Sequence, residues 1–447
     1  MRVFMATEEK AFTGRPLRNK ELLSGAFFWL SAFYFVYCAR PEDWIPGLNH
    51  IPLAKVTAIF AFVSLFMSLG RAQRKFRDLP REAGYLLALI GLLVASALLS
   101  PVWPGGAFFH AVDFSKVYVA WVVTFMLVTT FSRLRRVIYI QAASVAVIAF
   151  VSLVKGHNTP RLDGVLGGIY SNPNDLAFAI VLSLPLCLAL LLTAKGLLPK
   201  LVWVCAMLAM ATALFLTASR AGFIDLVISG AVCLWHFGIR GKRPQLIVAA
   251  VLVLGTLMLL AGGLLRARFA TIYSDDVNTE VRSAYGSYEQ RKFLYFKSLE
   301  GMEHHPLFGV GIRCFANYSG VWREVHNAYL EIGVEGGIPV LILYLMIFQR
   351  GFANLSSLRR RRDLDLHTTL FVGALHSSLV GFAVGALFAP EAYQFFLYFA
   401  VAQSSALMAI VKEQDAAEVL PSKVSRRFKQ FAEAYGRHRS NELTPVH

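Results

Sequence analysis

The segment Leu176–Ala194, "LAFAIVLSLPLCLALLLTA", contains no charged side chain. A helix of about 20 apolar residues is long enough to cross the roughly 30 Å hydrocarbon core of a bilayer. Similar apolar blocks recur along the chain, in which 56% of residues are hydrophobic and only 16% are charged. A soluble protein of 447 residues needs more charge to cover its surface. The sequence therefore predicts an all-α polytopic membrane protein with one membrane domain.

The apolar blocks predict about twelve transmembrane helices within residues 22–411. They lie near residues 22–38, 51–70, 83–100, 112–131, 137–154, 176–194, 197–218, 222–239, 246–265, 328–349, 369–389 and 392–411. Clusters of Lys and Arg such as "RAQRKFRDLPRE", "SRLRR" and "IRGKRPQ" fall on one side of this arrangement. Because short cytoplasmic loops are enriched in Lys and Arg, this asymmetry predicts that both termini are cytoplasmic.

The net charge of +16 is explained most simply by this topology. The cations cluster in loops and tails on one side of the membrane, which argues against nucleic-acid binding. Residues 1–21 and 412–447 are then cytoplasmic tails. The basic C-terminal tail anchors the topology or binds an acidic partner.

One loop on the outer side, residues 266–327, is much longer than the others. Its stretch from Tyr288 to Met302 has apolar residues at helical spacing, and Pro306 and Gly309 predict where that helix stops. Long loops within compact proteins are usually functional or disordered, and the aromatic content of this loop favours function.

Several cations occupy the outer side. Arg220 lies in "LTASRAGF", a short turn between two expected spans, and Arg161 and Arg291 lie in the longer outer loops. Such residues can be snorkelling or solvated charges. An arginine in a short outer turn runs against the charge asymmetry, however, which favours an anionic ligand for Arg220.

The segment "EVHNAYLEIGVEGGIPV", Glu324–Val340, places His326 where the long loop meets the tenth expected span. The imidazole is either an interfacial side chain bonded to backbone or a proton acceptor near neutral pH. Asn327 is a candidate helix cap. Glu331 and Glu335 share one helix face, and we expect this face to point into the protein, pairing with a cation such as Arg220.

No P-loop, GxGxxG, CxxC or HExxH motif is present, so no nucleotide, metal or other cofactor is predicted. Chemistry on the outer side has no ATP, and a substrate there must carry its own leaving group. A lipid-linked sugar diphosphate does so, and arginines bind phosphates through paired, charge-assisted hydrogen bonds.

The motifs "SNPNDLA", "LTASRAGF", "HPLFGVG" and "HNAYLEIGVEGGI", in this order, resemble the O-antigen ligase superfamily over about residues 160–350. The resemblance implies a glycosyltransferase class C-like fold in the bacterial inner membrane, with the active site facing the periplasm. It implies metal-independent transfer of a glycan from undecaprenyl diphosphate to a hydroxyl of a glycan, lipid A–core or protein acceptor.

The resemblance also implies roles for single residues. Arg220 and Arg291 match the family's arginines, His326 its essential histidine, and Asn327 the partner position. Glu335 matches an acid whose role the resemblance does not define. Val340 departs from the ligase pattern, which leaves a polysaccharide polymerase as an alternative.

Two further alternatives remain open. A metal-dependent class C transferase uses acids in the first outer loop, where Glu42 and Asp43 occur in "RPEDW". A transporter or flippase for lipid-linked sugars also needs arginines facing a cavity, although it does not need His326.

Overall fold

The structure is a computed structural model that describes residues 24–156, 161–162, 170, 172–270 and 279–417. In this part of the chain the regular structure is helical, and no strand occurs. The main helices are α3 (Ser24–Ala39), α4 (Pro41–Trp44), α5 (Leu53–Met67), α6 (Arg81–Leu98), α7 (Pro104–Leu127), α8 (Phe131–Lys155), α9 (Pro173–Thr193), α10 (Leu197–Leu216), α11 (Arg220–Leu234), α12 (Pro244–Leu260), α13 (Gly263–Ala270), α14 (Thr279–His304), α15 (Phe315–Ser319), α16 (Ala328–Gly336), α17 (Ile338–Arg360), α18 (Leu366–Gly385) and a final helix Phe395–Ala417.

Among the described residues, nine helices are long and apolar enough to cross a membrane. Three shorter apolar helices, α3, α5 and α12, overlap the other expected spans. The prediction of a polytopic membrane protein is therefore confirmed, whereas the number of crossings and the cytoplasmic termini stay predictions. The expected tails fall largely outside the described residues, because residues 1–23 and 418–447 are not described.

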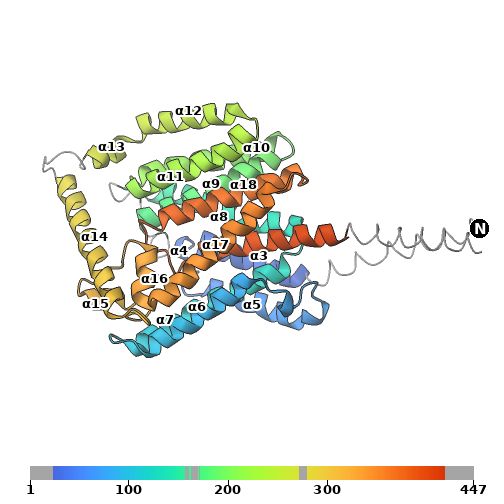
Figure 1. Ribbon diagram of the computed structural model, residues 1–447. Helices are drawn as coiled ribbons and strands as arrows, with labels where there is room; N and C mark the ends of the chain where they lie inside the picture. Colours follow the sequence, from blue (N-terminus) through green and yellow to red (C-terminus); the bar gives the residue numbers. More distant parts are fainter. Residues whose placement is uncertain (1–23, 157–160, 163–169, 171, 271–278, 418–447) are drawn as a thin grey trace, which may run out of the picture.

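The bundle is centred on α9, where 83% of the most apolar window is buried. It contacts α8, α10, α11 and α18. By contrast α10 buries only 28% of its window, and α12 contributes no buried residue. Figure 1 shows α12 at the edge of the bundle.

The tenth expected span, residues 328–349, is wrong as a single helix. The structure breaks it into α16 and α17 at Gly337, whose φ is +86°. A Cβ on Gly337 would lie 2.5 Å from the carbonyl oxygen of Leu307, so the backbones meet there with no room for a side chain. The break leaves α16 as a short helix beside the long loop.

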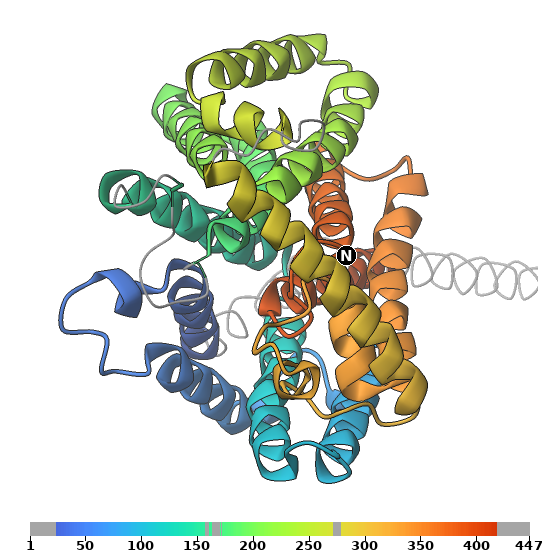
Figure 2. The same ribbon diagram turned by 90° about the vertical axis from the view of Figure 1, so that its left-hand side faces the viewer.

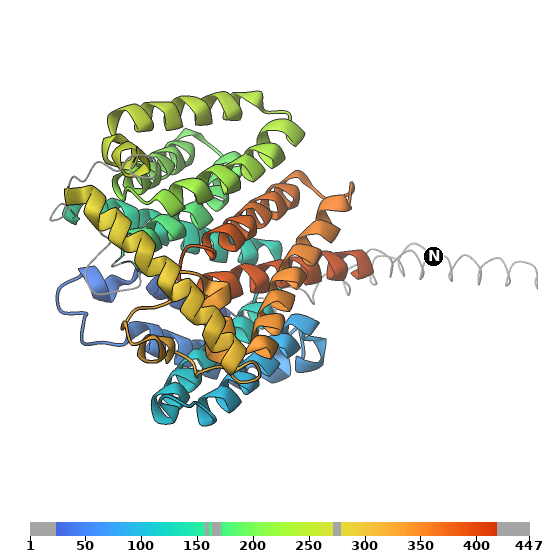
Figure 3. The ribbon, with the colours of Figure 1, turned by 60° about the vertical axis from the view of Figure 1, so that its left-hand side comes forward.

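The long loop folds over one end of the bundle, which we call the loop end. It contains α14 and α15, and α14 crosses this end diagonally (Figures 2 and 3). The expected helix Tyr288–Met302 is confirmed within α14, which stops at His304 just before Pro306. Helix α14 packs on α16, so the loop is attached to the segment that follows His326.

Candidate active site

A cavity of about 150 Å³ at the loop end contains three of the expected site residues, Arg291, His326 and Asn327. Arg291 enters it from α14, and His326 enters it from the segment before α16. The cavity lining consists of Arg291, Tyr295, Val325, His326, Asn327, Leu330, Leu387 and Phe388. Three chain segments that are distant in sequence thus converge on one imidazole and one guanidinium.

Local hydrogen bonds hold the residues that follow His326. The Oδ1 atom of Asn327 accepts from the backbone N–H groups of Tyr329 at 3.0 Å and Leu330 at 3.1 Å, which confirms Asn327 as the N-cap of α16. The N–H of Ala328 donates to the carbonyl of Ala386 at 2.7 Å. The first turn of α16 is therefore tied to the end of α18.

His326 has cationic neighbours. Burial, followed by the positive charges of Arg291 and Arg323, lowers the pKa of the His326 imidazole to about 4. The side chain is consequently neutral at pH 7, with a lone pair available on one ring nitrogen. A bound anion that neutralised Arg291 would raise this pKa and make the imidazole a stronger base.

Glu331 and Glu335 point inward, as expected, and are only 1% and 4% exposed. The cation beside them is Arg313, which the sequence analysis missed. Its Nη1 atom lies 4.0 Å from Glu331 Oε1 and forms an ion pair with Glu324. Burial raises the pKa of both Glu331 and Glu335, and the Arg313 charge opposes this shift.

A tight turn places Arg313 among these carboxylates. Gly309 and Gly311 have φ values of +64° and +100°, and Arg313 itself has φ +58°. The backbone N–H of Val310 donates to the carbonyl of Val334 at 2.8 Å, and that of Gly311 to the carbonyl of Glu335 at 2.9 Å. The turn is therefore bonded to α16 along its length.

The segment after α18 completes the surroundings of Arg313. The N–H of Ala392 donates to Glu331 Oε2 at 3.2 Å, and the guanidinium lies over the Tyr393 ring, 5.4 Å from its centroid. Burial raises the pKa of Glu391, followed by the negative charge of Asp175, while Arg313 lowers it. Glu391 is thus close to the first turn of α9.

Arg161 and Arg220 belong to a second cluster at the loop end. Arg161 Nε donates to the carbonyl of Thr217 at 2.8 Å, and its Nη2 to Asn174 Oδ1 at 3.2 Å. Ser219 caps α11 and donates to the same Asn174 oxygen at 2.8 Å. Arg161 thus braces the turn that presents Arg220.

Arg220 is the first residue of α11, immediately after this turn. Arg161 and Arg220 are not among the residues that line the His326 cavity. Their roles in substrate binding stay predictions, as do those of Asn327 and Glu335.

The acids of the first outer loop are held by a cation. Arg40 donates to both carboxylate oxygens of Asp43, at 2.9 and 3.1 Å, and lies 3.2 Å from Glu42. Over the described ranges, no group of three or more His, Cys, Asp or Glu side chains is arranged to hold a metal ion. Metal independence stays a prediction that a chelator can test.

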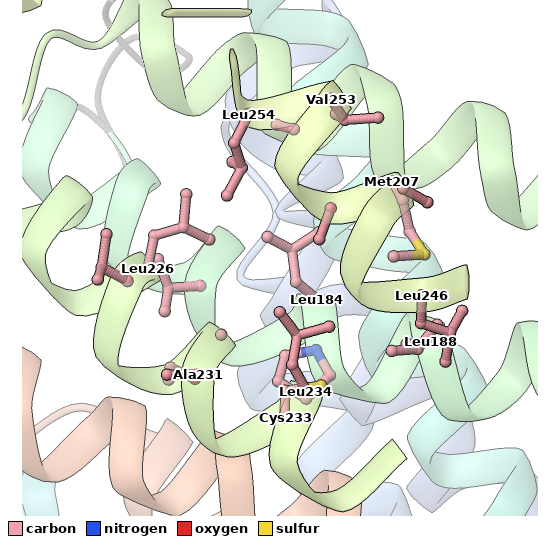
Figure 4. A pocket seen from close by; sticks show the side chains of 18 of the residues that line it. Leu184, Leu188, Met207, Leu226, Ala231, Cys233, Leu234, Leu246, Val253 and Leu254 are labelled. Carbon is pink, nitrogen blue, oxygen red and sulfur yellow. The ribbon is translucent and has the colours of Figure 1, made fainter. Parts of the chain in front are cut away.

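An apolar groove of about 460 Å³ lies between α9, α10, α11 and α12, at the edge of the bundle (Figure 4). Leu184 and Leu188 line it from α9, Met207 from α10, and Leu226 from α11. Leu226 follows Arg220 by six residues, or about 9 Å along a helix axis. The cavity therefore lies below the turn that carries Arg220.

Comparison with known families agrees with the motifs. Residues 205–345 match the family model described as O-antigen ligase. This segment is therefore similar to the O-antigen ligase family. The match runs from α10 through α14 and α16 into α17, so it includes Arg220, Arg291 and His326. The resemblance to O-antigen ligases is thereby confirmed, and no curated protein matches the chain.

Proposed function

We propose that this O-antigen ligase-like protein is a membrane glycosyltransferase that moves a glycan from undecaprenyl diphosphate to an acceptor hydroxyl. One observation carries the proposal: Arg291 and His326 line the same cavity, although α14 and the start of α16 are distinct elements. A cation beside a neutral imidazole suits a reaction with an anionic leaving group and a hydroxyl nucleophile.

The donor diphosphate binds to Arg291, with Arg220 as its second cation. Arginine suits this role because its fork of N–H donors matches phosphate oxygens. Arg161 contributes indirectly by holding the turn at residues 217–219. The developing charge on the leaving diphosphate is stabilised by the guanidinium groups, so no general acid is needed.

His326 accepts the proton of the acceptor hydroxyl. The hydroxyl oxygen forms a bond to the anomeric carbon, while the bond from that carbon to the diphosphate oxygen breaks on the opposite face. The electron pair leaves with undecaprenyl diphosphate, and the configuration inverts. Burial is the largest cause of the lowered His326 pKa, and the charge of Arg291 adds to it. A diphosphate bound beside Arg291 offsets that charge, so the donor itself strengthens the base.

The apolar cavity of Figure 4 receives part of the polyprenyl chain. Its lining is almost entirely hydrocarbon, and it lies along α11 below Arg220. An amphipathic carrier with a diphosphate head and an isoprenoid tail matches this succession of a cation and an apolar groove.

The same chemistry serves a polysaccharide polymerase when the acceptor is another repeat unit. The orientation we propose puts the loop end in the periplasm and the cationic loops in the cytoplasm of a bacterial inner membrane. We propose no metal or other cofactor, and activity that survives EDTA is the corresponding test.

The experiment is a surface-polysaccharide gel from a deletion strain that carries wild-type protein, His326→Ala or Arg291→Ala. Unligated long chains that remain on the carrier in both variants support a ligase. An acceptor that carries only single repeat units supports a polymerase. Full rescue by both variants refutes the site and favours a transporter of lipid-linked sugars.

A further inference from the structure

The cavity around His326 is too small for the partners of a transfer between saccharides. Its 150 Å³ compares with roughly 300–1,000 Å³ for typical ligand pockets. It can hold the reacting groups, but the sugar chains on either side of the new bond need further surfaces.

A larger, polar cavity of about 740 Å³ lies at the end of α3 and the start of α5. It is lined by Arg40, Glu42, Asp43, Asn49, His50, Ile51, Pro52, Ala54 and Lys55. Its formal charges balance, because two cationic side chains face two carboxylates. Such a mixture of donors, acceptors and apolar patches suits a neutral, hydroxyl-rich ligand rather than a phosphate or a cation.

This cavity is preorganised by its own backbone. Arg40 has a left-handed φ of +46°, an uncommon conformation for a residue with a side chain. Its ion pairs with Glu42 and Asp43 hold it there. Trp44 is fixed as well, since its indole N–H donates to Ala39 O at 2.8 Å and its carbonyl accepts from Lys155 Nζ at 3.1 Å. Glu42 Oε2 is buried without a hydrogen-bond partner among the described residues.

A short chain of contacts links this cavity to His326. Tyr37, three residues before Arg40, donates to Gln394 Oε1 at 3.0 Å and accepts from the N–H of Phe395 at 3.1 Å. Residues 387–388 of the same segment line the His326 cavity. Figure 2 shows this segment, coloured red-orange, between the blue α3–α5 region and α14.

We infer that the cavity between α3 and α5 is the subsite for the saccharide of the acceptor. The inference rests on the proposed function. The apolar groove is lined by α9–α12, whereas this cavity is lined by the blue α3–α5 region, which lies apart from α12 (Figure 2). An inverting displacement needs the acceptor and the leaving diphosphate on opposite faces of the anomeric carbon. We therefore assign the acceptor saccharide to the α3–α5 side of the anomeric carbon and the diphosphate to the α9–α12 side.

Photocrosslinking in the full-length protein tests the binding directly. Benzoylphenylalanine replaces Ile51, which lines the cavity and is 45% exposed. The matched control replaces Ile59, which is 61% exposed on α5 outside the cavity. Periodate labelling then detects vicinal diols on the adducts. We expect labelled adducts at Ile51 and not at Ile59, and we expect them to persist in the His326→Ala background.

A kinetic test distinguishes the acceptor from the donor. The double variant Asn49→Ala/His50→Ala removes two lining side chains, and His304→Ala, an exposed residue at the end of α14, is the control. We expect transfer by the double variant to fall about 30-fold at low acceptor concentration, as two lost hydrogen bonds imply. Acceptor-independent hydrolysis of the undecaprenyl diphosphate donor is expected to stay unchanged.

Adducts at Ile51 that carry only lipid or protein overturn the inference, as does equal labelling at Ile59. Equal loss of transfer and donor hydrolysis also overturns it, because the cavity then serves the donor or the fold. These failures differ from failure of the proposed function, in which wild-type protein does not transfer from the donor at all.

Discussion

Asn327 offers a sharp test of how the site is held together. Its Oδ1 atom accepts two backbone hydrogen bonds at the start of α16, at 3.0 and 3.1 Å. Replacing an N-cap Asn by Ala costs about 1 kcal/mol, whereas Ser retains a capping oxygen. We therefore expect Asn327→Ala to lower transfer by up to about fivefold, the factor that 1 kcal/mol represents. Asn327→Ser is expected to match wild type.

The alternative is that the Asn327 amide donates directly to the substrate. Loss of a hydrogen bond to a charged group costs about 1.5–3 kcal/mol, which is roughly 10- to 150-fold in rate. Both variants lack the amide, so both would then fall by at least about tenfold. Transfer rates of the purified variants, with thermal unfolding measured in parallel, distinguish the two cases. A stable Ser variant with a rate as low as that of the Ala variant refutes a purely capping role.

Three more predictions follow from the described contacts. Because protonated His326 cannot act as a base, kcat/KM should fall as the pH drops through about 4. The acidic fall in kcat, which reports the enzyme with donor bound, should occur at higher pH. Acidic falls at the same pH for kcat and kcat/KM contradict donor-assisted activation. The Leu side chain of Gly230→Leu projects into the apolar groove without a clash. It should lower kcat/KM for an undecaprenyl donor about 15-fold, because it displaces roughly two methylene groups of the lipid. The kcat/KM for a shorter farnesyl donor should stay unchanged. Gly255→Leu, outside the groove on α12, is its control, and equal effects on both donors contradict the assignment. Arg313→Met leaves buried carboxylates without their cation and should lower the free energy of unfolding by about 3 kcal/mol. The double variant Arg313→Met/Glu331→Gln should recover part of this loss. Denaturation in detergent measures both variants, and no recovery in the double variant refutes the pairing.

The sequence predicted much of the fold because a bilayer imposes one simple pattern. Each expected span overlaps an observed apolar helix, since about 20 apolar residues can satisfy their backbone groups in lipid only as a helix. The error at residues 328–349 arose because a hydropathy average hides local turn signals. Gly337 followed by Pro339 ends one helix and starts another, although the surrounding residues are apolar enough for a continuous span.

The site was predicted in part for a similar reason. His326 and Asn327 could be found because a polar pair at the edge of an apolar helix is visible in the sequence alone. Arg313 could not, since it is one cation among several in a long loop. Its importance depends on a left-handed backbone and on packing against α16. The available signals were the glycines at 309 and 311 and two inward carboxylates that required a cation.

The distribution of charge around α16 explains how one histidine can serve as a base. The carboxylates of Glu331 and Glu335 lie near Arg313, whereas the charges of Arg291 and Arg323 act on His326 and lower its pKa. A carboxylate beside an imidazole raises its pKa and favours the protonated form. Burial and the two arginines lower the His326 pKa, and the acids gathered around Arg313 do not oppose that shift. In the proposed mechanism the charge that strengthens the base arrives with the substrate, so His326 is the strongest base when a donor diphosphate is bound.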